Sequence, residues 1–176
     1  MRILQVITSL QTGGAEKIVV DITRKMRARE HIVDVVVFNG VDTPFMEDIR
    51  KTGCKVFSLS HGGSVYNPLH ILRLVGIMKK YDVVHSHNTS PQFFVAAANM
   101  LSGIPIVTTE HSTTNRRRNN GLWKPLDRWM YNCYSLIICI SDKAEKNLRK
   151  YLGCCKSSII TVLNGVDVRA IHNAEP

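Results

Sequence analysis

Seven runs of hydrophobic residues recur along the chain at nearly even intervals. They are rich in valine and isoleucine and lie at residues 2–8, 32–38, 56–59, 83–86, 106–109, 136–140 and 159–163. Near-continuous hydrophobic runs of this length, rather than strict alternation with polar residues, are typical of strands buried on both faces of a parallel sheet. The pattern therefore predicts seven parallel strands.

Segments with helical periodicity separate these runs. They lie at residues 15–29, 44–52, 68–79, 91–101, 124–134 and 142–151. Prolines stand at or near the starts of four of them, where a missing N–H costs little. In the last segment, Asp142 and Glu145 have the spacing of a capping box. The alternation predicts an α/β fold, namely a Rossmann-like, doubly wound parallel sheet of about seven strands with helices on both faces.

Two adjacent glycines, Gly13 and Gly14, follow the first predicted strand and open the first predicted helix. In doubly wound sheets ligands bind beyond the carboxyl ends of the strands, which is where this pair lies. Glycine lets a ligand approach the backbone, and a helix N-terminus offers unpaired N–H groups that favour an anion. The pair belongs to neither a G-x-G-x-x-G nor a P-loop pattern. A plain turn and a phosphate contact both stay open as interpretations.

Histidines stand at the ends of two middle strands. His85 and His87 are two residues apart on one predicted strand, so their side chains point to one face. We expect His85 to be a hydrogen-bonded core residue, and His87, Asn88, Glu110 and His111 to orient or bind a ligand. Three histidines also suit a zinc site of the hydrolase type. No carboxylate other than Glu110 lies at a matching strand end, which disfavours that alternative.

The charged residues point to an anionic partner. The formal net charge is +9, which suits a nucleic acid, an acidic membrane surface or a phosphorylated small molecule. Arg116, Arg117 and Arg118 lie in a predicted loop, followed by the only tryptophans, Trp123 and Trp129. Arginine favours phosphate, and basic groups beside tryptophan suit a membrane interface. A solvated loop is the alternative, and nucleic acid is not expected because no recognition motif is present.

Three further features of the sequence indicate in which cellular compartment the protein works. No hydrophobic run approaches the roughly 20 residues that span a membrane, and no secretory cleavage pattern follows Met1. The five cysteines are an odd number without metal-ligand spacing, which suits a reducing compartment. We therefore expect a cytoplasmic protein that can rest on the inner membrane face.

Four stretches of the chain together resemble the N-terminal half of the retaining "group 1" glycosyltransferases. They are ITSLQTGGAEKIVVDI, YDVVHSHNTS, IVTTEHS, and LIICISDKAEKNLRKYLG with SIITVLNGVD. They occur in the family's order and spacing over nearly the whole chain. The stretch TEHSTTNRRRNNGLWKPLDRW is similar to members that act in capsule or exopolysaccharide assembly.

The resemblance implies the GT-B fold, in which two Rossmann-like domains face each other across a cleft. Residues 1–165 would be the acceptor-side domain, and residues 166–176 would begin the linker to a donor-binding domain outside this chain. The activity implied is transfer of a sugar from a nucleotide-sugar donor to a saccharide or lipid-diphosphate-linked acceptor. No metal or other cofactor is expected, since the chain has no D-x-D motif. This half alone is expected to turn over little or no substrate.

The resemblance also assigns roles to individual residues. Gly13 and Gly14 would face the donor diphosphate and the reacting acceptor, and His111 would hold the donor sugar near the reacting carbon as the catalytic candidate. The turn that leads into the second domain would comprise Asn164, Gly165 and Asp167. A stand-alone Rossmann-like module that binds a nucleotide or sugar without catalysis stays open as an alternative.

Overall fold

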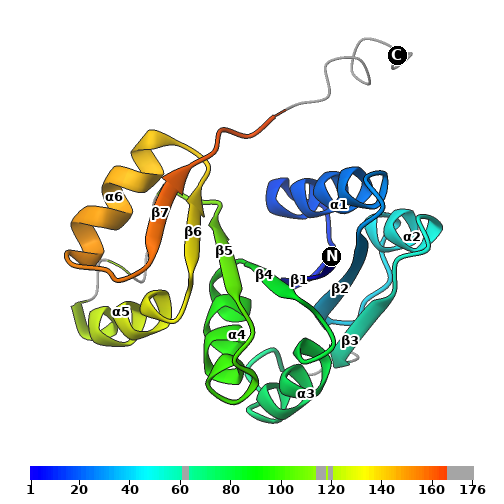
Figure 1. Cartoon of the computed structure of the whole chain (residues 1–176), viewed down its shortest axis with the longest axis horizontal. Helices are drawn as coiled ribbons and strands as arrows, with labels where there is room; N and C mark the ends of the chain where they lie inside the picture. Colours follow the sequence, from blue (N-terminus) through cyan, green and yellow to red (C-terminus); the bar gives the residue numbers. More distant parts are fainter. Residues whose placement is uncertain (61–63, 114–117, 119–120, 166–176) are drawn as a thin grey trace.

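A seven-stranded parallel sheet forms the centre of the protein (Figure 1). The structure is a computed structural model that describes residues 1–60, 64–113, 118 and 121–165. The strand order is β3-β2-β1-β4-β5-β6-β7. The strands are β1 (Arg2–Ile7), β2 (Ile32–Asn39), β3 (Val56–Ser60), β4 (Val83–His87), β5 (Ile106–Glu110), β6 (Leu136–Cys139) and β7 (Ser158–Thr161). The predicted fold class is therefore confirmed.

Helices connect the strands in the expected order. They are α1 (Gly14–Arg27), α2 (Pro44–Lys51), α3 (Leu69–Met78), α4 (Thr89–Ser102), α5 (Lys124–Asn132) and α6 (Asp142–Leu152), with the short 3-10 helix η2 (Gly121–Trp123) before α5. Every predicted strand and helix matches an observed one, with bounds that differ by no more than two residues. Among the helices of the described residues, none is both long and apolar enough to cross a membrane.

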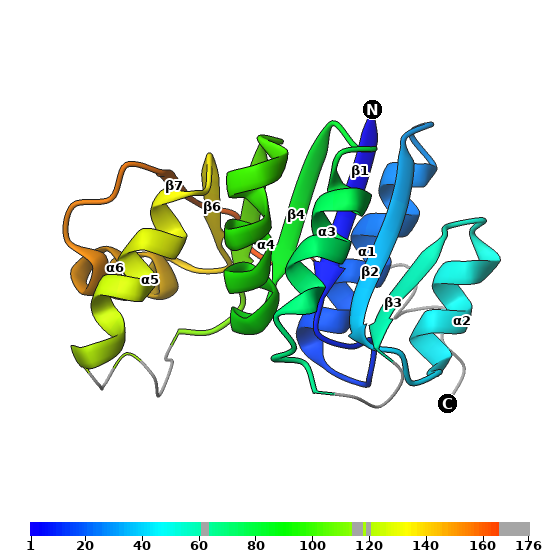
Figure 2. The ribbon, with the colours of Figure 1, turned by 90° about the horizontal axis from the view of Figure 1, so that it is seen from below.

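The helices form two layers, one on each face of the sheet (Figures 1 and 2). On one face, Val19 and Val20 of α1 and Met46 and Ile49 of α2 pack on hydrophobic side chains of β1 and β2. On the other face, α3, α4, α5 and α6 bury a larger cluster that spans the sheet. Burial of both faces explains why the strands read as continuous hydrophobic runs.

Side chains at the helix starts show how local sequence sets the helix bounds. The Thr43 hydroxyl caps α2 by accepting from the Met46 N–H at 3.2 Å, and Pro44 occupies the first turn. The predicted capping box in α6 is wrong. Ser141 is the N-cap and accepts from the Ala144 N–H at 3.2 Å. Glu145 instead accepts from Arg149 Nε at 2.8 Å.

The strand order reverses between β1 and β4. From β1 the chain proceeds to β2 and β3 on one side, and then returns to place β4 on the other side of β1. Loops leaving adjacent strands in opposite directions open a crevice at the carboxyl ends, where doubly wound proteins bind ligands. The fold therefore places a candidate site beyond the ends of β1, β4 and β5.

Candidate functional site

The predicted site residues follow three neighbouring strands at this edge. Gly13 and Gly14 come after β1, Asn88 follows β4, and His111 follows β5. All pairings between these strands are parallel, so their carboxyl ends lie along one edge of the sheet. Residues that are far apart in the sequence are thus gathered at the point where the strand order reverses.

The glycine pair leaves the N-terminus of α1 open. Gly13 is the N-cap with φ of −174° and ψ of 165°, an extended conformation that any residue adopts, and it makes no side-chain cap. A Cβ added at Gly14 would have no atom within 4 Å, and one added at Gly13 would meet the carboxylate of Glu16, the movable end of a side chain. Neither backbone conformation nor rigid packing requires glycine here. The pair therefore leaves free space beside backbone N–H groups.

The three histidines form a stack on the face of the sheet that carries α1. The ring centroids of His85 and His87 are 4.1 Å apart, and those of His87 and His111 are 5.2 Å apart. His85 Nε2 lies 2.7 Å from Thr109 Oγ1, which bears out its interpretation as a hydrogen-bonded core residue. His87 is 0% exposed and lies between Gln5 Oε1, at 2.7 Å, and His111 Nε2, at 2.9 Å.

His87, which was predicted to orient or bind a ligand, is held by protein groups on both sides. Its ring is buried, and both of its nitrogens have protein partners. His111 is the histidine of the stack that lines a cavity at the carboxyl edge. Ligand contact by His111 stays a prediction, and His87 lies behind it as its hydrogen-bond partner.

Burial keeps the three rings neutral, because desolvation disfavours the imidazolium form. It lowers the pKa of His85 from 6.5 to about 3 and that of His111 to about 4. Burial also lowers the pKa of His87 well below its ordinary value, with a smaller contribution from the neighbouring rings. Near neutral pH the stack is a set of hydrogen-bonding groups without charge.

The stack does not have the geometry of a zinc site. His87 Nδ1 and His111 Nε2 face each other at hydrogen-bond distance instead of converging on a shared point. Across the part of the chain that the structure describes, no group of three His, Cys, Asp or Glu side chains could hold a metal ion. The histidines therefore suit hydrogen bonding rather than metal ligation.

Glu110, one residue before His111, points to the opposite face, toward α5. Its carboxylate accepts from Tyr131 Oη at 2.5 Å and forms an ion pair with Arg118 at 2.9 Å. The Arg118 side chain is only 9% exposed. Burial, the largest single effect, lowers the pKa of Arg118, but charge attraction and hydrogen bonds from Glu110 and Tyr131 together outweigh it, so the pKa is raised above its ordinary value. These three residues form a buried charged cluster.

The buried charged cluster gives two of the predicted ligand-contact residues a protein partner, and their contact with a ligand stays a prediction. Glu110 and Arg118 were expected to contact a ligand or membrane phosphate, but in this structure each is the other's partner. Arg116 and Arg117 lie outside the described residues, so their predicted role stays a prediction.

A cavity of about 130 Å³ lies where β4 and β5 end. Its lining comprises Asn88, Thr89, Gln92, Thr109, Glu110, His111 and Ser112. Asn88 has φ of 68° and ψ of 155°, a region that is populated almost only by glycine. Strain of this kind costs on the order of 1–3 kcal/mol and is concentrated at functional sites. The backbone strain therefore falls at the predicted ligand-binding edge.

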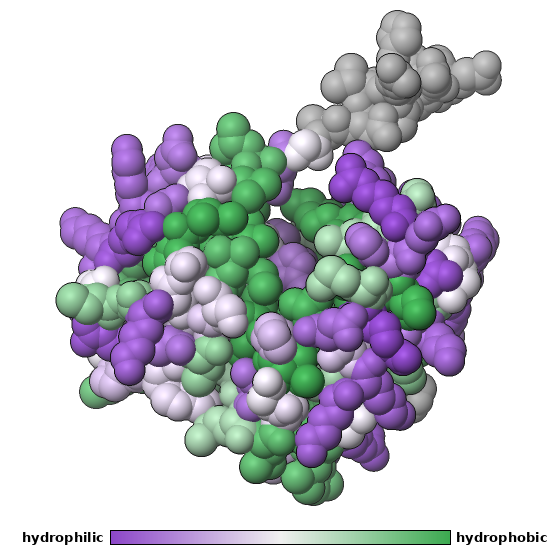
Figure 3. Space-filling model, in the orientation of Figure 1, coloured by the Kyte–Doolittle hydropathy of each residue, from purple (hydrophilic) through white to green (hydrophobic). Residues whose placement is uncertain are grey.

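A second hollow lies between α1 and the β6–β7 side of the sheet, where Figure 3 shows hydrophobic residues gathered. Its volume is about 270 Å³, and its lining includes Ile18 and Ile22 of α1 and Ile138 and Ile140 near β6. Asn164 and Gly165 lie at this hollow rather than at the cavity beside His111. Asp167 lies outside the described residues, so the interdomain role of this turn stays a prediction.

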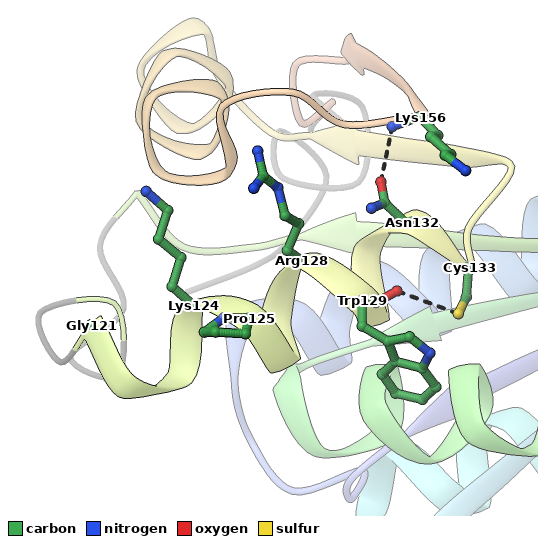
Figure 4. Close-up of a pocket in the computed structure, with 8 residues that line it drawn as sticks. All are labelled: Gly121, Lys124, Pro125, Arg128, Trp129, Asn132, Cys133 and Lys156. Atoms are coloured by element: carbon green, nitrogen blue, oxygen red, sulfur yellow. Dashed lines mark hydrogen bonds between the residues drawn. The ribbon is translucent and has the colours of Figure 1, made fainter.

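The outer side of α5 carries a basic pocket of about 720 Å³ (Figure 4). Lys124 and Arg128 project from one side of the helix, and Trp129 points away from them. Lys156, whose backbone N–H donates to Asn132 Oδ1 at 2.9 Å, adds a third cation to the lining. This basic pocket was not predicted as a unit, because Lys156 is distant from the others in the sequence.

Sequence reasoning also missed Gln5 and Tyr131. Gln5 is the one polar residue inside the hydrophobic run of β1, and that interruption was an available signal. Tyr131 gave no such signal, because its partner Glu110 lies 21 residues away. Both residues acquire their importance only through contacts made in the folded chain.

One family model matches most of the chain. The model of the family described as Glycosyltransferase Family 4 matches residues 12–170. A putative glycosyltransferase of Bacillus subtilis, EpsF, is 30% identical over 128 residues, which is 70% of this chain and 33% of that protein. The phosphatidyl-myo-inositol mannosyltransferase of Mycobacterium tuberculosis is 26% identical over 169 residues, covering 92% of this chain and 43% of that protein.

Solved structures show the same fold. Anabaena Alr3699/HepE, in complex with UDP and glucose, superposes with a TM-score of 0.77 at 20% identity, over 96% of this chain and 46% of that one. A glycosyltransferase from Rickettsia africae ESF-5 also gives 0.77, at 18% identity, over 99% and 46% of the two chains. The chain thus spans between a third and a half of the length of these relatives.

Proposed function

Since the chain belongs to Glycosyltransferase Family 4 and has the fold of one half of the matching structures, we propose that it is the acceptor-side half of a retaining glycosyltransferase. The whole protein would transfer a sugar from a nucleotide-sugar donor to a saccharide or lipid-diphosphate-linked acceptor in surface polysaccharide synthesis. Residues 1–165 would form this half, and residues 166–176 would begin the link to the donor-binding half. What supports this proposal is that Gly13, Gly14 and His111 follow the parallel strands β1 and β5, on either side of β4, at one edge of the sheet.

The open glycine pair suits the leaving diphosphate. Transfer from a nucleoside diphosphate sugar builds negative charge on the leaving group, and fixed N–H dipoles stabilise such charge without reorganisation. The first N–H groups of α1 have no side-chain cap, and a side chain at Gly14 would project into the free space beside them. We assign Gly13 and Gly14 to backbone contact with the diphosphate and the reacting acceptor.

The neutral ring of His111 suits the sugar. Burial lowers its pKa to about 4, so at neutral pH the ring offers a hydrogen bond without introducing a positive charge. A developing cationic centre on the sugar would be disfavoured beside an imidazolium ion. We assign His111 to holding the donor sugar near the reacting carbon. Asn88 lines the same cavity and would contact the substrate.

The basic pocket on α5 suits an anionic membrane surface. Lys124, Arg128 and Lys156 gather beside Trp129, and Leu122 in the preceding turn is 85% exposed. Cationic groups next to exposed apolar residues favour an interface with anionic lipid. The proposal places this face against the inner membrane surface, where a lipid-linked acceptor would reside. Lys124→Ala with Lys156→Ala should weaken binding to anionic liposomes, and unchanged binding would remove this role.

The central experiment measures donor consumption by the whole gene product. A panel of UDP-, GDP- and ADP-sugars would be offered to the wild type, to His111→Ala and to Gly14→Ala. His31→Ala is the matched control, because His31 precedes β2 at the amino edge of the sheet, away from the site. We expect one donor to be consumed, with losses of about 10²-fold or more for His111→Ala, since misplacement of the reacting groups has effects of that size.

Gly14→Ala separates function from folding in the same experiment. An added methyl group meets no atom within 4 Å, so the unfolding free energy should change by less than about 0.5 kcal/mol. Donor consumption should nevertheless fall, because the methyl group would stand where the diphosphate approaches. If no donor is consumed, or if the reading frame ends near Pro176 and the chain only binds nucleotide, the transferase proposal fails in favour of a binding module.

A further inference from the structure

Gln5 and His87 form a buried hydrogen-bonded chain that ends at His111. Both side chains are 0% exposed. Gln5 Oε1 lies 2.7 Å from His87 Nε2, and His87 Nδ1 lies 2.9 Å from His111 Nε2. Of the three, His111 lines the cavity at the carboxyl edge. These hydrogen bonds therefore link Gln5, in the middle of β1, to the ring of His111 at the cavity.

The positions of the protons follow from the acceptor at the buried end. A carboxamide oxygen only accepts, so His87 Nε2 carries a hydrogen. In a neutral ring His87 Nδ1 is then unprotonated and accepts in turn, so His111 Nε2 must donate. The remaining nitrogen, His111 Nδ1, is left with its lone pair. The hydrogen bonds from Gln5 through His87 thus determine which tautomer His111 adopts.

The arrangement has a free-energy cost that a purely structural core residue would avoid. Gln5 Nε2 is buried and has no hydrogen-bond partner within the described residues. A buried unpaired donor costs about 1–3 kcal/mol, and a leucine would fill the same strand position without that cost. The hydrogen bond that Gln5 makes to His87 offsets this cost only in part, and its effect on the histidine gives the polar side chain a role.

We propose that Gln5 and His87 are positioning residues that hold His111 in the Nε2–H tautomer, so that its Nδ1 accepts a hydrogen bond from a hydroxyl group of the bound sugar. This inference rests on the proposed function for the identity of the ligand. It specifies the chemistry of the contact: His111 recognises a hydroxyl donor, whereas the opposite tautomer would present an N–H suited to phosphate oxygens. The ring of His85 lies against that of His87, with the ring centroids 4.1 Å apart.

The first test needs no substrate. NMR of the chain labelled with ¹⁵N in its seven histidines reports the tautomer of each neutral ring, and His111→Ala assigns the critical signals. At pH 7.5 we expect Nε2–H for both His87 and His111. If wild-type His111 carries its proton on Nδ1, the Gln5 amide has the opposite orientation and the proposal is overturned.

Variants of Gln5 test the cause. Gln5→Leu removes the acceptor, so the signals of His87 and His111 should become those of mixed tautomers. Gln5→Glu keeps an acceptor at the same place and should preserve Nε2–H. Thr23→Val is the matched control: Thr23 is a buried residue of α1 whose hydroxyl has no hydrogen-bond partner among the described residues, and the hydrogen bonds of His87 do not involve it. An unchanged His111 tautomer in folded Gln5→Leu would contradict the proposal.

Kinetics of the whole gene product provide the second readout. Gln5→Leu should lower kcat for donor consumption by about 10- to 100-fold with a smaller change in KM, as loss of an orienting partner does for ligating histidines. Gln5→Glu should recover most of the rate, and Thr23→Val should stay near the wild type. If the NMR result holds but no sugar donor is consumed, the positioning of His111 stands and the proposed function fails.

Discussion

Two consecutive residues at the end of β5 lead to two different buried polar environments. His111 extends toward the α1 face, where the polar groups are neutral and form the chain through His87 to Gln5. Glu110 extends toward α5, where its carboxylate forms the buried charged cluster with Arg118 and Tyr131. Each environment leaves one buried nitrogen without a partner within the described chain, Gln5 Nε2 on one face and Arg118 Nη1 on the other.

The difference shows how a fold can hold two polar groups at one strand end for separate purposes. A buried ion pair is stable only while both charges are present, because removal of one leaves the other desolvated and unpaired. A row of neutral, hydrogen-bonded side chains is destabilised less by the loss of one partner. Its stability does, however, depend on pH, because protonation of a buried histidine is unfavourable. The charged cluster therefore fixes the side chains of Arg118 and Glu110 against each other, while the histidine stack presents an uncharged ring at the cavity.

The largest expected effect is loss of one member of the buried charged cluster. Arg118→Ala leaves the Glu110 carboxylate buried without its cation, and breaking a buried pair in this way destabilises by about 3–5 kcal/mol. Urea unfolding of the 176-residue chain at pH 7.5 measures the change. A shift below about 1 kcal/mol would show that the pair behaves as a solvated surface contact.

Two further variants identify the origin of that effect. Replacing both charges, with Arg118→Met and Glu110→Leu together, should recover much of the lost free energy of unfolding, since apolar residues of similar volume often substitute for a buried ion pair. Tyr131→Phe removes the hydroxyl that donates to Glu110 at 2.5 Å and should cost about 1–3 kcal/mol. A double variant less stable than Arg118→Ala would contradict the electrostatic explanation.

An intermediate effect is expected from acid on the histidine stack. The folded-state pKa of His85 is lowered to about 3, so between pH 6.5 and 3 the unfolded chain binds more protons than the folded one. Stability is therefore complete above pH 6.5 and falls as the pH drops. At pH 5.0 the loss from His85 should be roughly 2 kcal/mol relative to pH 7.5, and His87 should add to it.

Urea unfolding at the two pH values, for the wild type and for His85→Gln, checks this prediction. The variant should lose roughly 2 kcal/mol less than the wild type on acidification. The choice of pH 5.0 separates the effect of the histidine from that of Glu145. Hydrogen bonds from Thr161 and Arg149 lower the pKa of Glu145 below its ordinary 4.5, so the stability that its carboxylate contributes is lost only at lower pH. Equal losses in both proteins would refute buried, neutral His85.

The smallest effect concerns backbone strain beside His111. Asn88→Gly relieves an unfavourable φ and ψ but adds chain entropy to the unfolded state, so the protein should gain about 1 kcal/mol of stability. Glu30→Gly is the matched control, with φ of 64° at a position distant from the cavity. Both should raise the midpoint of thermal unfolding, and only Asn88→Gly should reduce donor consumption. A destabilised Asn88→Gly would show that its side chain supports the fold.

Hydrophobic patterning alone predicted the fold. Strand and helix bounds, the parallel sheet and the coverage of both faces are consequences of local periodicity and of the need to bury continuous apolar runs. The shared edge at which the candidate site residues lie was also predictable, because the carboxyl ends of parallel strands meet there. Gly13, Gly14, Asn88 and His111 were accessible to sequence reasoning for that reason.

The partners of the polar side chains were not predictable in this way. His87 and Arg118 were both expected to meet a ligand, but each is buried against protein groups, Gln5 and His111 in one case and Glu110 and Tyr131 in the other. The same residue types occur in exposed and buried settings, and sequence spacing does not distinguish them. Even the start of α6 depended on which of two adjacent residues, Ser141 or Asp142, reached the free N–H.

The sequence by itself determined which residues form the sheet and which follow its strands, because burial of apolar runs is a short-range property of the chain. Only the tertiary structure decided that Glu110 and His111, neighbours in the sequence, would have partners on opposite faces of the sheet. The hydrogen bonds of His111 lead through His87 to Gln5, which is 106 positions away in the sequence. Hydrogen bonds and ion pairs act over about 3 Å, so they exist only once folding has brought their atoms together.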